Sequence, residues 1–180
     1  MAEPVIRVSS ITTRHMGWRD IWWARNVRNN PLTRHFLGDH SLIGRWQQIR
    51  WFNRMNRDKS KARLIVLWND IRVGIARIDS IDHQNQSLCI GMDIDPKWRG
   101  FGLAQAAYKA LFIHFFKTFK YHRLWLLVAS DNDRAIHIYQ KLGFTTEGTQ
   151  KEAILKNGKW IDYHYMALLK QDYEKLYPQY

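Results

Sequence analysis

The sequence predicts a single α/β (α+β) domain of 180 residues with a mixed central sheet. Three observations support this prediction. The length suits one domain that can bury a hydrophobic core. Segments with a two-residue apolar period and segments with a helical period alternate along the chain. Residues 124–128 (LWLLV) are continuously apolar, which is typical of a strand buried on both faces of a sheet.

The first third predicts a strand followed by two helices. Residues 5–11 alternate apolar and polar side chains, which indicates a half-buried or edge strand. Residues 15–29 form the first expected helix, which Asn29-Asn30-Pro31 ends. Residues 42–55 form the second, and Ser41 is the candidate N-cap.

The middle of the chain predicts three strands and a long helix. Residues 62–68, 71–81 and 87–95 are strand-like and are separated by short polar turns, so we expect an antiparallel meander. Residues 102–119 then have the apolar spacing of a long amphipathic helix.

The last third predicts a strand, a helix and a hairpin. After strand 124–128, Ser130, Asp131 or Asn132 caps a helix that runs to Leu142, and Gly143 ends it. Residues 144–155 and 160–169 are strands on either side of Asn157-Gly158, a strong hairpin signal. Residues 171–180 predict a short helical tail.

The composition indicates a basic protein with an anionic partner. The net charge is +12, and residues 1–63 hold 13 Lys and Arg against 4 Asp and Glu, a balance of +9 in the first third. This charge favours nucleotides, coenzyme phosphates, nucleic acid or a ribosomal surface. The 8 histidines are scattered without metal-ligand spacing, so no metal site is expected. One cysteine, no signal pattern and no membrane-length apolar run suit a cytoplasmic protein.

Residues 95–105 read as the loop between a strand and a helix, and they carry Gly100 and Gly102. The N-terminus of a helix offers free backbone N–H groups and the positive end of the helix dipole, so it attracts anions. Glycines permit positive φ values and let phosphate approach the backbone. The loop is therefore a candidate phosphate site.

Two motifs carry a resemblance to the GCN5-related N-acetyltransferases (GNAT). The loop Arg99-Gly100-Phe101-Gly102-Leu103-Ala104 resembles the pyrophosphate loop of that family, Arg/Gln-x-x-Gly-x-Gly/Ala. About thirty residues later, Asn132, Ala135, Tyr139 and Gly143-Phe144 resemble its Asn-x-x-Ala-x-x-x-Tyr-x-x-x-Gly-Phe signature. The resemblance covers residues 62–169, and the first sixty residues match in architecture only. Trp98 and Phe101 depart from the small or basic residues that relatives often carry.

The resemblance implies the GNAT fold, β-α-α-β-β-β-α-β-α-β-β, with a splayed pair of parallel strands and acetyl-CoA between them. Backbone N–H groups near Met92–Ile94 would hold the acetyl oxygen, and Tyr139 would protonate the leaving thiolate as general acid. Asn132 would bond the pantetheine arm or fix the start of the helix. The expected acetyl-CoA-binding residues are Met92, Asp93, Ile94, Arg99, Gly100, Phe101, Gly102, Leu103, Ala104, Asn132, Ala135 and Tyr139.

The base that removes the amine proton is left open. Asp93 is a polar residue in an apolar strand near the expected acetyl position, which makes it a candidate. Asp95, Glu147, Asp162 and an ordered water are the alternatives.

The resemblance divides the domain into residues 1–60 on the acceptor side, 62–144 as the acetyl-CoA-binding core and 145–169 as the C-terminal hairpin. The acceptor-side residues are basic and aromatic, which suits phosphate contacts and base stacking. The candidate substrate-binding residues are Arg25, Arg28, Arg34, His35 and Phe36.

The acceptor is expected to be a primary amine on a small molecule or peptide that is anionic overall. Trp23-Ala24-Arg25-Asn26 resembles sugar-nucleotide acetyltransferases, which favours an amino sugar on a UDP carrier. The hairpin with Asn157-Gly158 resembles spermidine and ribosomal-protein acetyltransferases, so a polyamine or a ribosomal-protein N-terminus is the alternative. A nucleic-acid-binding or non-catalytic relative is the alternative of another class.

Overall fold

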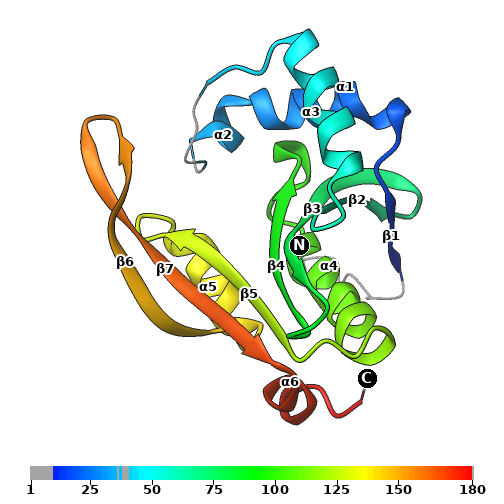
Figure 1. Cartoon of the computed structure of the whole chain (residues 1–180), viewed down its shortest axis with the longest axis vertical. Helices are drawn as coiled ribbons and strands as arrows, with labels where there is room; N and C mark the ends of the chain where they lie inside the picture. Colours follow the sequence, from blue (N-terminus) through cyan, green and yellow to red (C-terminus); the bar gives the residue numbers. More distant parts are fainter. Residues whose placement is uncertain (1–9, 36, 38–40, 180) are drawn as a thin grey trace, which may run out of the picture.

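The computed structural model describes residues 10–35, 37 and 41–179. Its centre is a seven-stranded mixed sheet with the order β1-β2-β3-β4-β5-β7-β6 (Figure 1). The strands are β1 (Ile11–His15), β2 (Ala62–Trp68), β3 (Ile71–Asp82), β4 (Ser87–Ile94), β5 (Arg123–Ala129), β6 (Thr145–Lys156) and β7 (Lys159–Leu169). The helices are α1 (Ile21–Asn29), α2 (Pro31–Arg34), α3 (Arg45–Arg57), α4 (Leu103–Phe112), α5 (Asp133–Lys141) and α6 (Lys170–Leu176). The predicted α/β class and element order are therefore confirmed.

The N-terminal boundaries differ from the prediction. Residues 5–9 of the predicted first strand lie outside the described residues, and β1 begins at Ile11. It extends to His15 because it pairs antiparallel with β2, from Ile11 opposite Trp68 to His15 opposite Leu64. The predicted helix start at residue 15 is therefore wrong, and α1 begins at Ile21 after a 3₁₀ turn.

The second predicted helix also starts later than expected. Gly44, and not Ser41, is the N-cap of α3, and its N–H donates to Gln47 Oε1 over 3.3 Å. The long predicted helix over residues 102–119 is likewise divided, because α4 ends at Phe112 and a π-helix, Ile113–Thr118, follows. Hydrogen bonding in the π-helix widens the last turns but keeps the chain helical.

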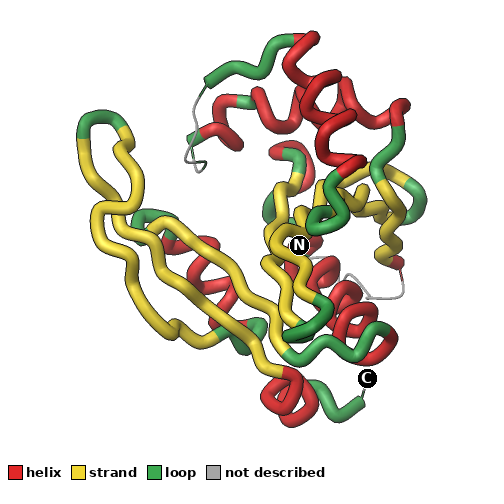
Figure 2. The backbone as a smooth tube through the Cα atoms, in the orientation of Figure 1, coloured by secondary structure: helices red, strands yellow, loops and turns green. Residues whose placement is uncertain are grey.

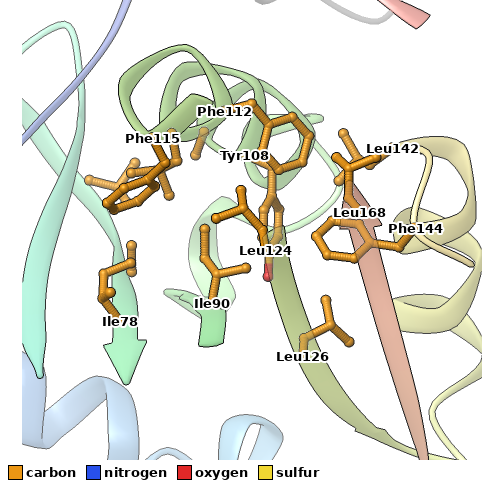
Figure 3. Packing of buried hydrophobic residues seen from close by; sticks show 14 of the residues in the cluster. Ile78, Ile90, Tyr108, Phe112, Phe115, Leu124, Leu126, Leu142, Phe144 and Leu168 are labelled. Carbon is orange, nitrogen blue, oxygen red and sulfur yellow. The ribbon is translucent and has the colours of Figure 1, made fainter. Parts of the chain in front are cut away.

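Two hydrophobic clusters cover opposite faces of the sheet. On one face α4 and α5 pack against β2–β5 and β7, and Figure 3 shows aromatic side chains such as Tyr108, Phe112 and Phe144 gathered there. On the other face α1 and α3 cover Ile65 of β2 and Ile75 of β3. The alternation of side chains along each strand assigns each residue to one of these faces.

The parallel pair β4–β5 separates along its length. Its pairing covers Ser87 with Arg123, Leu88 with Leu124 and Cys89 with Trp125, and it goes no further. Beyond that point β4 continues its antiparallel pairing with β3, while β5 continues with β7. Figure 2 shows the two strands close together at one end and apart at the other. We call this opening, between residues 90–94 and 126–129, the fork.

Candidate active site

The loop between β4 and α4 has the backbone of a phosphate-binding turn. Gly100 and Gly102 have φ values of 91° and 74°, which confirms the predicted positive φ. Nothing lies within 4 Å of a Cβ built on either glycine, so backbone conformation and not crowding requires them. Gly102 directly precedes α4, so the free N–H groups of the first turn of α4 adjoin the loop.

The side chain of Arg99 is engaged within the protein. Its Nε donates to the Ile94 carbonyl over 3.1 Å, its Nη1 to the Leu32 carbonyl over 3.1 Å and its Nη2 to Thr33 Oγ1 over 2.8 Å. The guanidinium thus ties the end of β4 to α2. With the guanidinium held in these contacts, the backbone N–H groups of the loop are the main candidates for binding phosphate.

A second cation near this loop was missed in the sequence. Burial lowers the pKa of Arg99, and the like charge of Arg134 lowers it further. Arg134 is exposed in the first turn of α5. Lys97, the lysine of the same loop, lies 3.9 Å from the Asp95 carboxylate and close to the Trp98 ring.

The two aromatic departures from the family motif pack on each other. The rings of Trp98 and Phe101 lie edge to face with centroids 6.2 Å apart, and Trp98 also meets Trp68 at 5.7 Å. Phe101 keeps 41% of its surface exposed. Trp98 therefore anchors the loop to the core, while Phe101 remains available beside the loop.

The edge of β4 presents backbone donors to the fork. Asp95 donates its N–H to the Val73 carbonyl over 2.9 Å, on the β3 side. Backbone groups alternate sides along a strand, so Asp93 also directs its N–H to β3, while Met92 and Ile94 direct theirs into the fork. These are the donors that the resemblance assigns to the acetyl oxygen.

Helix α5 brings Tyr139 to the fork from the opposite side. Asn132 caps the helix by accepting from the Ala135 N–H over 3.2 Å, so the structure gives it the helix-fixing role. The Tyr139 ring lies edge to face against Tyr108 at 5.7 Å and Phe144 at 5.9 Å. These contacts fix the direction of the Tyr139 side chain.

The electrostatic surroundings suit Tyr139 as a proton donor. Burial raises the pKa of Tyr139, while the charge of Arg77 opposes this shift and that of Asp93 adds to it. Arg77 and Asp93 belong to the opposite face of the sheet, and their charges act on the pKa of the Tyr139 hydroxyl across the opening between β4 and β5. A phenol with a raised pKa is fully protonated at neutral pH, as a general acid requires.

Tyr108 is a neighbour that the sequence analysis missed. Its hydroxyl is buried and has no hydrogen-bond partner among the described residues. Burial raises the pKa of Tyr108, and Tyr139 raises it further. The two hydroxyls influence each other, although no hydrogen bond of normal geometry joins them. In the sequence, the helical spacing of apolar residues after Gly102 was the signal that could have placed Tyr108 on the buried face of this helix.

Asp93 shares a face of the sheet with Ile75, its partner on β3, and is paired with Arg77 of β3. The distance from Arg77 Nε to Asp93 Oδ2 is 3.2 Å. The other candidate bases have structural partners: Asp95 accepts from the Lys97 N–H, Glu147 pairs with Arg123, and Asp162 accepts from the Glu152 N–H. Among these carboxylates, Asp93 is the one that acts on the pKa of Tyr139.

Aromatic side chains continue the same face beyond the fork. Trp125 of β5 stacks on Tyr165 of β7 with centroids 5.0 Å apart and an angle of 15°. Burial raises the pKa of Tyr163, while Arg77 opposes the shift, which places Tyr163 in the electrostatic range of Arg77. The sequence analysis did not single out these three residues, whose shared face depends on the pairing of β5 with β7.

The predicted acceptor residues lie on α1 and α2, with different contacts. Arg25 donates its Nε to the Ile43 carbonyl over 2.6 Å and so supports the segment before α3. Arg28 is in the last turn of α1, and Arg34 ends α2 just before His35. Phe36 lies outside the described residues. A role of these side chains in binding the acceptor stays a prediction.

Within residues 10–35, 37 and 41–179, no group of three or more His, Cys, Asp or Glu could hold a metal ion. Over the same part of the chain, no helix is long and apolar enough to span a membrane.

A splayed pair of parallel strands and a glycine loop before a helix are the features that the resemblance assigns to an N-acetyltransferase, and sequence comparison identifies the family. The profile of the acetyltransferase (GNAT) family matches residues 18–144. The chain therefore belongs to the GNAT family, whose members use acetyl-CoA.

Individual relatives extend the similarity over most of the chain. Spermidine N(1)-acetyltransferase of Escherichia coli K12 is 24% identical over 164 residues, which cover 91% of this chain and 88% of that protein. The [ribosomal protein uS5]-alanine N-acetyltransferase of the same organism is 29% identical over 184 residues, with 94% of each chain covered. The crystal structure of spermidine N-acetyltransferase from Vibrio cholerae with CoA and spermine superposes with a TM-score of 0.86 at 23% identity, covering 92% and 98%.

Proposed function

We propose that this N-acetyltransferase transfers the acetyl group of acetyl-CoA directly to a primary amine of a spermidine-type polyamine. The observation that carries the acceptor class is the similarity to spermidine N-acetyltransferases, which extends over nine-tenths of the chain. No comparison supports the amino sugar on a UDP carrier, so the polyamine alternative of the sequence analysis replaces it.

The acceptor face is compatible with a small aliphatic cation. The carboxylate of Asp93 lies at the fork, where it would attract an ammonium group. The half-buried faces of Trp125, Tyr163 and Tyr165 would pack on methylene chains and attract cations through their rings. This wall runs along β5 and β7 away from the fork.

The transfer follows from the positions around the fork. The acceptor nitrogen, after losing a proton, attacks the thioester carbonyl, whose oxygen is held by N–H groups of Met92 or Ile94. The C–S bond then breaks, and its electron pair leaves with the sulfur. Tyr139 donates its proton to that sulfur and is reprotonated by the new amide nitrogen. The products are the N-acetyl amine, CoA thiol and one proton.

A protein N-terminus is the second candidate acceptor. The similarity to the uS5-alanine acetyltransferase covers 94% of each chain, and the basic balance of +9 over residues 1–63 would favour docking near ribosomal RNA. This candidate uses the same fork and the same Tyr139.

An acceptor panel separates these possibilities. The purified protein is incubated with acetyl-CoA and, in turn, spermidine, spermine, a peptide with an N-terminal alanine and a UDP-linked amino sugar, while CoA thiol release is followed. Release with the polyamines at a kcat/KM at least about tenfold above the other acceptors supports the proposal. Release with the peptide alone supports the second candidate. Absence of a thermal shift with acetyl-CoA contradicts both, because a ligand that binds only the folded state must stabilise it.

A further inference from the structure

Arg77, Gly91 and Asp93 form a compact group at the acceptor side of the fork. Arg77 of β3 is directly opposite Gly91 of β4, and Ile75 is opposite Asp93. Cross-strand partners share a face, so Arg77, Gly91 and Asp93 all project toward the acceptor side. The guanidinium reaches diagonally to Asp93, with Nε 3.2 Å from Oδ2.

The missing side chain of Gly91 gives the guanidinium its place. A Cβ on Gly91 would lie 2.9 Å from Arg77 Nη2 and 3.2 Å from Cζ. Any other residue at position 91 would therefore displace the guanidinium from its place. Because Gly91 does not have a positive φ, its backbone would accept another residue, and the constraint comes from this contact alone.

We infer that Arg77 is a positioning residue that holds the carboxylate of Asp93 beside the acceptor amine, with Gly91 providing the space for the guanidinium. This inference rests on the proposed acetyl transfer. Asp93 would take one proton from the acceptor ammonium, which frees the nitrogen lone pair to form the C–N bond. The proton then passes from Asp93 to solvent, while Tyr139 protonates the leaving sulfur.

The charges around Arg77 support a role in the reaction. Asp93 makes the largest contribution to raising the pKa of Arg77, and Tyr139 of α5, Tyr108 of α4 and Asp79 of β3 add to it. Asp79 already has its own partner, Arg63 of β2, at 2.9 Å.

The charge of Arg77 also acts on the pKa values of three neighbouring side chains. Arg77 opposes the burial shifts of Tyr139 and of Tyr163 of β7. It also lowers the pKa of Cys89 of β4, which burial raises. One cation therefore acts on both the candidate base and the candidate acid.

The geometry leaves part of the ion pair open to a substrate. The side chain of Arg77 is 40% exposed and that of Asp93 is 18% exposed. The ion pair with Arg77 is made through Oδ2 of Asp93, and the amine is proposed to approach the same carboxylate.

The test is the pH dependence of kcat for Arg77→Gln at saturating acetyl-CoA and amine. Without the guanidinium the carboxylate of Asp93 is no longer held beside the acceptor amine, so kcat falls by at least about tenfold. The alkaline limb also moves to higher pH, because Arg77 no longer lowers the pKa of Tyr139. An opposite charge at this range is worth about one pH unit or more in that limb. Arg77→Lys restores the positive charge and moves the alkaline limb back toward wild type.

Two variants separate positioning from a general structural role. Gly91→Ala displaces the guanidinium without removing a charge, and it is expected to lower kcat by a smaller factor than Arg77→Gln. Arg72→Gln removes an arginine from the other end of β3, where it pairs with Asp20, and is expected to leave the profile unchanged.

The outcomes are distinguishable from failure of the proposed function. If the wild type acetylates no amine, the proposed function fails. If the wild type is active and the profiles of Arg77→Gln and Gly91→Ala superimpose on it, only the role of Arg77 is overturned. A fall in kcat that is equal at every pH, with the alkaline limb in place, also overturns it.

Discussion

Removal of the Tyr139 hydroxyl is the perturbation that isolates proton donation from packing. Tyr139→Phe keeps the ring and its edge contacts with Tyr108 and Phe144 at 5.7 and 5.9 Å. No hydrogen bond of normal geometry is lost, so the free energy of unfolding should change by less than about 1 kcal/mol. The melting temperature should then shift by no more than about 4 °C.

The catalytic effect is expected to be much larger. Loss of a general acid lowers kcat by about 10² to 10⁴, which corresponds to about 3–5 kcal/mol of barrier. The KM for acetyl-CoA should stay within about twofold, because the hydroxyl acts in the transition state rather than in binding the ground state. The assay is CoA thiol release under saturating acetyl-CoA and amine.

A matched control and a pH profile complete this prediction. Tyr121→Phe removes a hydroxyl that bonds His83 Nδ1 over 3.0 Å, away from the fork, and should leave kcat unchanged. Because burial raises the pKa of Tyr139, wild-type kcat should not fall from loss of its proton until above about pH 10. A Tyr139→Phe enzyme with kcat within about threefold of wild type would refute the general-acid assignment.

Three further outcomes follow from the structure. Gly102→Val places a β-branched residue at a φ of 74°, so it should cost about 1–2 kcal/mol in thermal or chemical unfolding and raise the KM for acetyl-CoA; an unchanged KM would separate the loop from the cofactor. Asn132→Ala removes the cap of α5 and should lower stability by about 1 kcal/mol, with kcat falling because Tyr139 is on the same helix; a stable variant with full activity would contradict this. Burial raises the pKa of the Cys89 thiol to about 11, so iodoacetamide at pH 8 should modify the native protein far more slowly than the unfolded chain; equal rates would contradict the burial.

Local signals in the sequence predicted most of the sheet correctly. Strand β2 has the predicted bounds, Ala62–Trp68, because its β-branched and apolar residues end at a polar turn. The hairpin of β6 and β7 turns at Asn157 and Gly158, whose φ values of 50° and 78° are those such a turn requires. These features depend on neighbours in sequence, which the sequence displays directly.

The errors occurred where distant pairing or capping decides the structure. The first helix was predicted to begin at residue 15, but pairing with β2 makes His15 the last residue of a strand. Ser41 offered a standard cap, yet α3 begins after Gly44. Such choices depend on which segment lies alongside, and local propensity carries little of that information.

The candidate site likewise contains residues that the sequence could place and residues whose position depends on distant pairing. Asn132 and Tyr139 lie seven residues apart on one helix, so their shared face could be predicted. Arg77 could not be assigned to the site, because its place beside Asp93 depends on the register of β3 against β4. Arg25 was expected to be available to a substrate, but its Nε holds the Ile43 carbonyl across a gap of 18 residues.

The most direct test of the account uses acetyl-CoA with an isotopically labelled acetyl group and spermidine. Mass spectrometry of the product, together with a thiol count, shows where the label goes. The account predicts that the intact labelled acetyl group appears on a spermidine nitrogen, with one CoA thiol released for each product molecule and no label on the protein. Label held covalently by the protein, or thiol release without an acetylated amine, would contradict direct transfer across the β4–β5 fork.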